Sequence, residues 1–105
     1  MKLAAIKSVT IIAPKKLKDE IVALLRSAGI SGYTYYPVVG GGEKQLREID
    51  SKEIENVKFR ILVPHLLAYT LMQVVAEKYF EKEKVILFEQ DANVMRFEKF
   101  DEVEY

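Results

Sequence analysis

The stretch that decides the fold is GYTYYPVVGGGEKQLREIDSKEIENVKFRILVP, residues 32–64. Its β-branched and aromatic beginning, Tyr33 to Val39, predicts a strand, and Pro37 within it indicates an edge or a bend. VKFRILV, residues 57–63, predicts the next strand. Residues 40–56 have no sustained helical or strand period, so we interpret them as one long loop. Loops above about 12–15 residues are uncommon in compact domains and tend to be functional or disordered.

On the N-terminal side of this stretch, the chain predicts a strand followed by a helix. Residues 3–12 are apolar and β-branched enough for a central strand. Apolar residues then recur at helical spacing over residues 17–28, with charged residues between them. Pro14 suits the first turn of this helix, and Gly29 suits the left-handed position that ends it.

On the C-terminal side, the order is repeated. A second helix is expected from His65 or Leu66 to Phe80, with a buried stripe that consists of Leu67, Leu71, Val74, Val75 and Tyr79. Other apolar residues extend beyond this stripe, so the helix has more than one apolar side. Residues 84–89 predict a fourth strand, and residues 93–100 are a candidate for a fifth.

The order strand–helix–strand–strand–helix–strand (βαββαβ) is that of the α+β, ferredoxin-like sandwich, in which both helices cover one face of an antiparallel sheet. We therefore expect one domain over residues 1–100, followed by an acidic tail at 101–105. The uncovered face of the sheet is partly apolar, and large exposed apolar surfaces usually mark an interface. A closed ring of identical subunits would cover it.

The amino-acid composition argues against several classes of function. The 105 residues hold 16 basic and 16 acidic side chains, and this balance provides no broad positive field for nucleic acid. The chain has no cysteine and one histidine, which excludes disulfides and the usual zinc sites and suits the cytoplasm. No apolar run approaches the roughly 20 residues of a membrane span. Because no nucleophile–base pair is recognisable, we do not expect an enzyme.

The loop itself has the chemistry of an anion site. Without Cβ atoms, Gly40, Gly41 and Gly42 let backbone N–H groups point toward one bound anion. Lys44 and Arg47 follow and can bind phosphate oxygens, Lys as a point charge and Arg through two parallel hydrogen bonds. The alternative from composition alone is a flexible hairpin with solvated charges.

Three segments together resemble a known family. SGYTYYPVVGGGEKQLR (31–47), ENVKFRILVP (55–64) and VAEKYFEKEKVILFEQDANV (75–94) are similar to PII-like signalling proteins. The similarity is greatest to the branch associated with bicarbonate transport and carboxysomes (the SbtB and carboxysome-PII type). It implies a homotrimer that binds adenine nucleotides in three clefts between subunits. The loop at 40–56 would be the family's T-loop, which changes order with the ligand and docks on a partner.

Carried over residue by residue, the resemblance implies a nucleotide site made of Thr34, Gly40, Gly41, Gly42, Lys44, Arg47, Lys84, Val85 and Ile86. Thr34 is expected at the base of the loop, close to the nucleobase or ribose. The segment before the fourth strand lacks the family's glycines, which favours AMP or ADP as effector and leaves ATP and cyclic AMP open. The partner would be a membrane transporter, for bicarbonate or another solute, contacted through Glu43, Gln45, Leu46, Glu48 and Ile49.

Two other functions fit the same architecture. One is a trimeric small-molecule-binding module of the ACT-like or CutA-like kind, which uses no nucleotide. The other is a single-stranded RNA binder, with Tyr33, Tyr35, Tyr36 and Phe59 stacking bases on the sheet. The chain lacks a basic, aromatic RNP-type stretch, so we expect no nucleic-acid partner.

Overall fold

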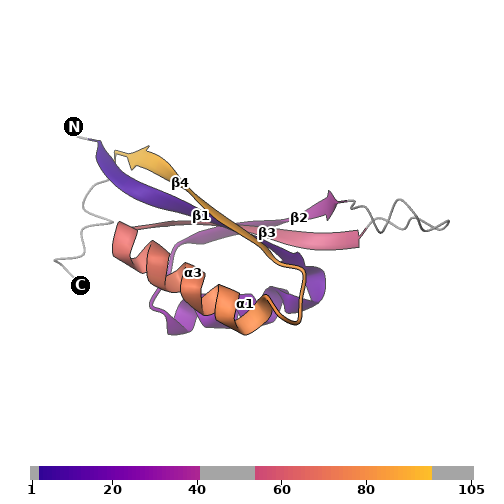
Figure 1. Cartoon of the computed structure of the whole chain (residues 1–105). Coiled ribbons are helices and arrows are strands. Elements are labelled where there is room, and N and C mark those ends of the chain that lie inside the picture. Colours follow the sequence, from indigo (N-terminus) through magenta and orange to yellow (C-terminus); the bar gives the residue numbers. More distant parts are fainter. Residues whose placement is uncertain (1–2, 41–53, 96–105) are drawn as a thin grey trace.

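The computed structural model describes residues 3–40 and 54–95. These residues form a four-stranded antiparallel sheet with two α-helices on one side of it (Figure 1). The elements in chain order are β1 (Ala4–Pro14), the 3-10 turn η1 (Lys15–Leu17), α1 (Lys18–Ser27), β2 (Tyr33–Gly40), β3 (Ile54–Val63), α3 (His65–Tyr79) and β4 (Ile86–Val94). The strands lie in the order β2-β3-β1-β4, which confirms the expected α+β, ferredoxin-like sandwich.

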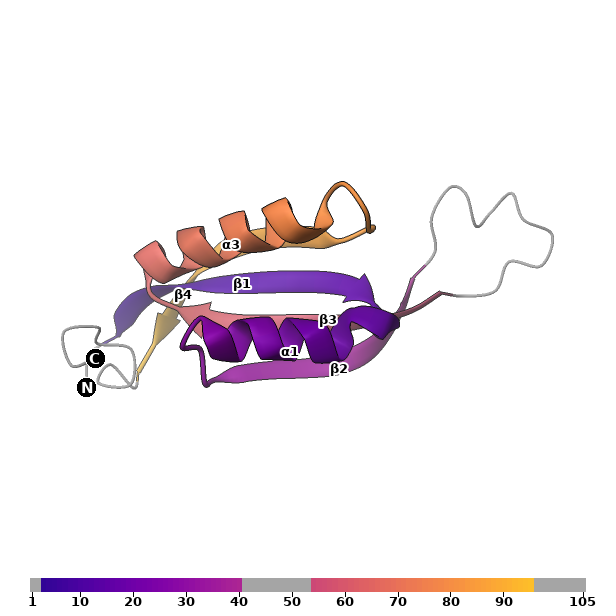
Figure 2. The ribbon, with the colours of Figure 1, turned by 90° about the horizontal axis from the view of Figure 1, so that it is seen from below.

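The hydrophobic core lies between the sheet and the helices. On β1, Val9 and Ile11 point toward the helices and are fully buried, and Phe59 and Ile61 do the same on β3. The helices divide the sheet between them, with α1 over β2 and β3 and α3 over β1 and β4 (Figure 2). Alternate residues of each strand therefore form a second face that neither α1 nor α3 covers.

The end of α1 determines where β2 begins. Gly29 has a φ of 79°, a conformation that suits glycine, as expected. Its N–H donates to the carbonyl of Arg26, and the N–H of Ile30 donates to the carbonyl of Leu25. This is the Schellman pattern, which satisfies the last carbonyls of a helix. The buried side chain of Ile30 then fixes the turn against the core.

Helix α3 carries apolar residues both on its buried side and on its exposed side. Its buried stripe consists of Ala68, Leu71, Val75 and Tyr79. The prediction that Val74 belongs to this stripe is wrong, since its side chain is 41% exposed. The hydroxyl of Tyr79 donates a hydrogen bond of 2.8 Å to Glu20 Oε1, which joins α3 to α1.

Several predicted boundaries differ from the structure. Pro14 ends β1 instead of entering the first helix, because its ψ of 142° is extended. β3 begins at Ile54, three residues before the expected start, so its pairing with β2 extends to Gly40. β4 runs from Ile86 to Val94 and includes the first residues of the proposed fifth strand. The rest of that segment, 96–100, lies outside the described residues.

Within residues 3–40 and 54–95, neither helix has the length and apolarity that crossing a membrane requires.

Candidate functional site

The strand register places two predicted segments at one end of the sheet. Gly40 pairs with Ile54, which is the last pair before residues 41–53. Ile86, the first residue of β4, pairs with Ile12 near the end of β1. Because β2 and β4 are the two edges of the sheet, Gly40 and Ile86 share an end of the molecule but lie on opposite edge strands.

Lys84 and Val85, the two residues before β4, offer backbone N–H groups to a ligand. Val85 packs against the core, so its side chain points inward. The N–H groups of Lys84 and Val85 donate to no backbone carbonyl of the described residues. Unpaired amides of this kind are available to an anion. Lys84 is exposed and forms no ion pair with a described residue, so its ammonium is available as well.

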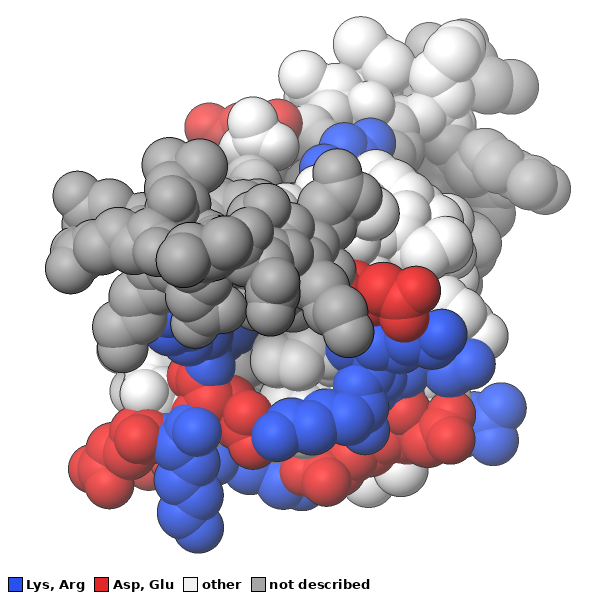
Figure 3. Space-filling view, turned by 90° about the vertical axis from the view of Figure 1, so that its right-hand side faces the viewer, with Lys and Arg blue, Asp and Glu red and all other residues white. Residues whose placement is uncertain are grey.

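Two other cations at this end have carboxylate partners. Lys15 Nζ lies 3.4 Å from Glu55 Oε2, and Lys16 Nζ lies 3.3 Å from Glu83 Oε1. Figure 3 looks onto this end and shows Lys and Arg side chains in a band with Asp and Glu side chains beside them. The surface is mixed in charge. Among the described residues, Lys84 is the predicted ligand-binding cation, since Lys44 and Arg47 lie outside them.

A pocket lies elsewhere, where α1 turns into β2 and β3 leads into α3. Its volume is about 850 Å³, within the usual range for small-molecule sites. The lining is mainly apolar, with the hydroxyls of Ser31, Thr34 and Thr70 and the guanidinium of Arg60 among it. Thr34 and Arg60 are neighbours in this lining, because they are paired directly across β2 and β3, and both are exposed.

Thr34 is therefore not at the base of the loop, where the sequence predicted it. It lies six residues before Gly40 on β2, a separation of about 20 Å at the usual rise of a strand. Thr34 and Gly40 are close in sequence, but an extended strand keeps them far apart. The structure thus separates Thr34, which lies in the pocket, from Gly40, which lies where β2 leads into residues 41–53, and it places residues 84–86 at the opposite edge of the sheet from both.

Arg60 is the residue that the sequence prediction missed. Within VKFRILV it alternates with buried residues, a pattern that indicates only a solvent-facing strand position. Its place opposite Thr34 depends on the pairing register, which the sequence does not specify.

The remaining predicted residues lie outside the described residues. In the proposed nucleotide site these are Gly41, Gly42, Lys44 and Arg47. All five proposed partner contacts, Glu43, Gln45, Leu46, Glu48 and Ile49, lie there too.

The aromatic residues considered for stacking RNA bases do not share the uncovered face. Tyr35 lies against Phe59, with ring centroids 5.3 Å apart, and Tyr33 lies next to both on the helix-covered side. Tyr36 alone has the opposite orientation, with Lys58 Nζ 5.9 Å from its ring centroid. One exposed tyrosine does not make the aromatic platform that RNA-binding sheets use.

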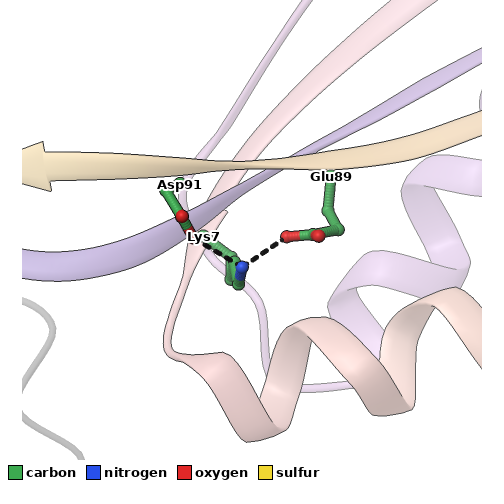
Figure 4. A network of polar contacts seen from close by, with 3 residues as sticks. All are labelled: Lys7, Glu89 and Asp91. Atoms are coloured by element: carbon green, nitrogen blue, oxygen red, sulfur yellow. Dashed lines mark hydrogen bonds and ion pairs between the residues drawn. The ribbon is translucent and has the colours of Figure 1, made fainter.

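A separate polar network links β4 to β1. Lys7 Nζ contacts Glu89 Oε2 at 2.8 Å and Asp91 Oδ1 at 2.5 Å, on the helix-covered side of the sheet (Figure 4). The hydrogen bond from Lys7 lowers the pKa of Asp91. The pKa of Lys7 is raised, mainly by its hydrogen bond to Asp91 and secondly by that to Glu89. Among the described residues, no cluster of three or more His, Asp or Glu side chains could hold a metal ion.

Comparison with known proteins identifies relatives of the whole domain. The model of the family described as nitrogen regulatory protein P-II matches residues 6–99. A crystal structure from Thermus thermophilus, provisionally assigned as a PII-like signaling protein, is 32% identical with a TM-score of 0.79; the alignment covers 95% of this chain and 99% of that one. No curated protein matched.

Two further structures show how far the similarity extends. CPII, a nitrogen regulatory PII-like protein from Thiomonas intermedia, was solved with ADP, AMP and bicarbonate. It is 26% identical with a TM-score of 0.76, over 90% of this chain and 98% of that one. A DUF3240 family protein from Shewanella baltica is 22% identical with a TM-score of 0.64, over 81% and 87% of the two chains, and it shares the fold.

Proposed function

This chain belongs to the nitrogen regulatory protein P-II family, and from that premise we propose that it is a homotrimeric sensor of adenine nucleotides. It is a PII-like regulatory protein, and its relative CPII was solved with ADP and AMP. The proposal adds that the nucleotide binds between subunits and that residues 40–56 report its presence to a partner.

The separation of Thr34 from Gly40 is the observation that carries the proposal. Both residues belong to the proposed site, yet about 20 Å of β2 lies between them. We infer from this separation that one subunit would supply two half-sites, one toward each end of β2, that contact different ligands. A nucleotide between subunits would contact the loop end of one subunit and the Thr34 pocket of its neighbour.

The uncovered face of the sheet supports self-association. Phe88, Ile86 and Tyr36 lie on it with exposed fractions of 39%, 56% and 41%. Apolar side chains gathered on one unlayered face favour association, since burying them removes apolar surface from water. In the proposed trimer, three such faces pack together and leave the helices outside.

At the loop end, the ligand's phosphates would meet backbone amides and cations. Gly40, Gly41 and Gly42 would provide close approach, with charge from Lys44 and Arg47. On the other wall, the amides of Lys84 to Ile86 and the ammonium of Lys84 would complete the site. Ordering each loop residue costs about 1–2 kcal/mol, which only a ligand with charged oxygens would offset.

The proposed partner is a membrane transporter for bicarbonate or another solute. The loop contacts would be Glu43, Gln45, Leu46, Glu48 and Ile49. CPII was solved with bicarbonate, which supports placing this chain near the bicarbonate-associated branch. A sensor of this kind acts where adenine nucleotides are abundant, in the cytoplasm, and would be recruited to the membrane through its partner.

Calorimetric titration with AMP, ADP, ATP and cyclic AMP tests the proposal. We expect saturable binding of at least one of them, with AMP or ADP tightest. The double variant Lys44→Ala/Arg47→Ala should weaken that binding by roughly 100-fold or more, because it removes two charged hydrogen-bond donors that contribute about 1.5–3 kcal/mol each. Lys52→Ala, in the same loop, is the matched control and should bind like the wild type.

Two results would count against the sensor. Absence of binding by the wild-type protein would favour the small-molecule module that uses no nucleotide. Unchanged binding in the double variant would remove the loop cations from the site.

A further inference from the structure

Arg60 is an unassigned cation on the wall of the pocket that contains Thr34. The two residues face each other across β3 and β2, so their side chains project from the same face of the sheet. Arg60 is exposed and forms no ion pair within 4.0 Å with any residue in the described ranges. This guanidinium lies on the wall of a pocket of about 850 Å³, and no carboxylate of residues 3–40 or 54–95 lies within 4.0 Å of it, so it is placed to donate to a ligand there.

The rest of the pocket suits a flat, mostly apolar group. Leu62, Leu66 and Leu67 contribute to the lining, and Leu66 is 75% exposed. Apolar walls with a few polar groups that fix orientation are typical of small-molecule sites. A purine ring has this character, with two apolar faces and a polar edge.

The orientation of the ligand follows from the proposed function, on which this inference rests. The glycines and cations at the loop end of one subunit would hold the phosphates. In the proposed trimer, the pocket of the neighbouring subunit would be the other wall of that cleft, and it would meet the end of the nucleotide that carries the base. Arg60 then lies at the polar edge of the base.

We propose that Arg60 selects the nucleobase by donating hydrogen bonds to its acceptor atoms, so that the site binds guanine nucleotides as well as adenine nucleotides. Arginine has five N–H donors and no acceptor. Its most common specific base contact is a bidentate pair with O6 and N7 of guanine. Adenine presents an amino donor beside N7, and a guanidinium can satisfy only the N7 of that pair.

Calorimetric titration of the full-length protein with ADP and GDP, in parallel, tests the proposal. For the wild type, we expect the Kd for GDP to lie within about tenfold of that for ADP. Arg60→Glu replaces donors with acceptors, which suit the adenine amino group and repel guanine O6. The ratio of the two Kd values should shift toward ADP by roughly 10-fold or more, since one good base contact discriminates by about that factor.

Arg60→Gln keeps hydrogen-bonding ability without the charge and should weaken GDP binding more than ADP binding. Arg26→Gln, an exposed arginine of α1 that does not line the pocket, is the matched control and should leave both constants unchanged. Circular dichroism and the elution volume of each variant verify that the fold and the assembly are retained.

The possible outcomes separate this inference from the proposed function. If ADP binds and the ratio of GDP to ADP affinity is the same in the wild type and both Arg60 variants, the base-selecting role is wrong and the sensor stands. An equal loss of both affinities would place Arg60 against a phosphate and also overturn the inference. If neither nucleotide binds the wild type, the proposed function fails, and the inference fails with it.

Discussion

Replacing Phe88 by alanine should raise the concentration at which the subunits assemble by about 100-fold. Phe88 lies on the uncovered face of the sheet, paired with Thr10 of β1, and is 39% exposed. An aromatic side chain can bury about 150–250 Å², so its exposed part is roughly 60–100 Å². At about 25 cal/mol per Å², covering this area contributes about 2 kcal/mol per subunit.

Three copies of the side chain would then contribute about 6 kcal/mol to the trimer, or about 10⁴-fold in its dissociation constant. The midpoint concentration of a monomer–trimer equilibrium varies as the square root of that constant, which gives about 100-fold. Analytical ultracentrifugation over a dilution series measures this midpoint. Where the wild-type midpoint is too low to measure, Phe88→Asp provides the second variant, since it would bury an unpaired charge and should yield monomers.

Phe80→Ala is the matched control for this experiment. Phe80 follows α3 on the opposite side of the molecule and is 52% exposed, so it offers comparable apolar surface. Its loss should not affect assembly. If Phe88→Asp remains trimeric, or if Phe80→Ala dissociates the trimer as strongly, the uncovered face of the sheet is not the interface.

Three further predictions concern the fold. Gly29→Ala should lower the free energy of unfolding by about 1 kcal/mol in urea titrations, because its φ of 79° disfavours alanine while nothing lies within 4 Å of the added Cβ; an unchanged midpoint would contradict this. Tyr79→Phe removes the hydrogen bond to Glu20 and should cost about 1 kcal/mol at pH 7. Burial raises the pKa of Tyr79, and the hydrogen bond to Glu20 raises it further. The free energy of unfolding of the wild type should therefore fall above pH 10, where only the unfolded state loses the proton, and the variant should lack that fall. Lys7→Met should return the pKa of Asp91, followed by NMR, from its lowered position toward 3.8, whereas Lys78→Met should leave it unaltered.

The order of elements was predictable because local patterns determine it. In β1 and β3, apolar residues either alternate with polar ones or follow one another along the strand. Gly29 marks the end of a helix because glycine adopts a positive φ readily. The boundaries at Pro14 and Ile54 were less predictable, because pairing with a neighbouring strand can extend a segment whose own composition indicates a loop.

The candidate site was less accessible to sequence reasoning, because its residues meet through register and not through proximity in the chain. Thr34 and Gly40 belong to one short motif, but the strand between them places them at different ends of the sheet. Arg60 joins Thr34 from a segment that carries no recognisable ligand motif. Tyr35 and Tyr36 are neighbours in sequence, yet a strand's alternation turns one toward Phe59 and the other away from the helices.

The proposed division of the site would couple ligand binding to assembly. In the proposed site, a subunit alone would hold one phosphate-facing end and one base-facing pocket, which lie about 20 Å apart along β2, too far for both to contact the same nucleotide. A ligand that needs both must bind two subunits at once, so by mass action it should stabilise the trimer. Phe88→Asp leaves every proposed nucleotide contact intact, but as a monomer it should bind ADP at least 100-fold more weakly in calorimetry. A monomeric variant that bound ADP with wild-type affinity would show that one subunit suffices, and the cleft between subunits would have to be abandoned.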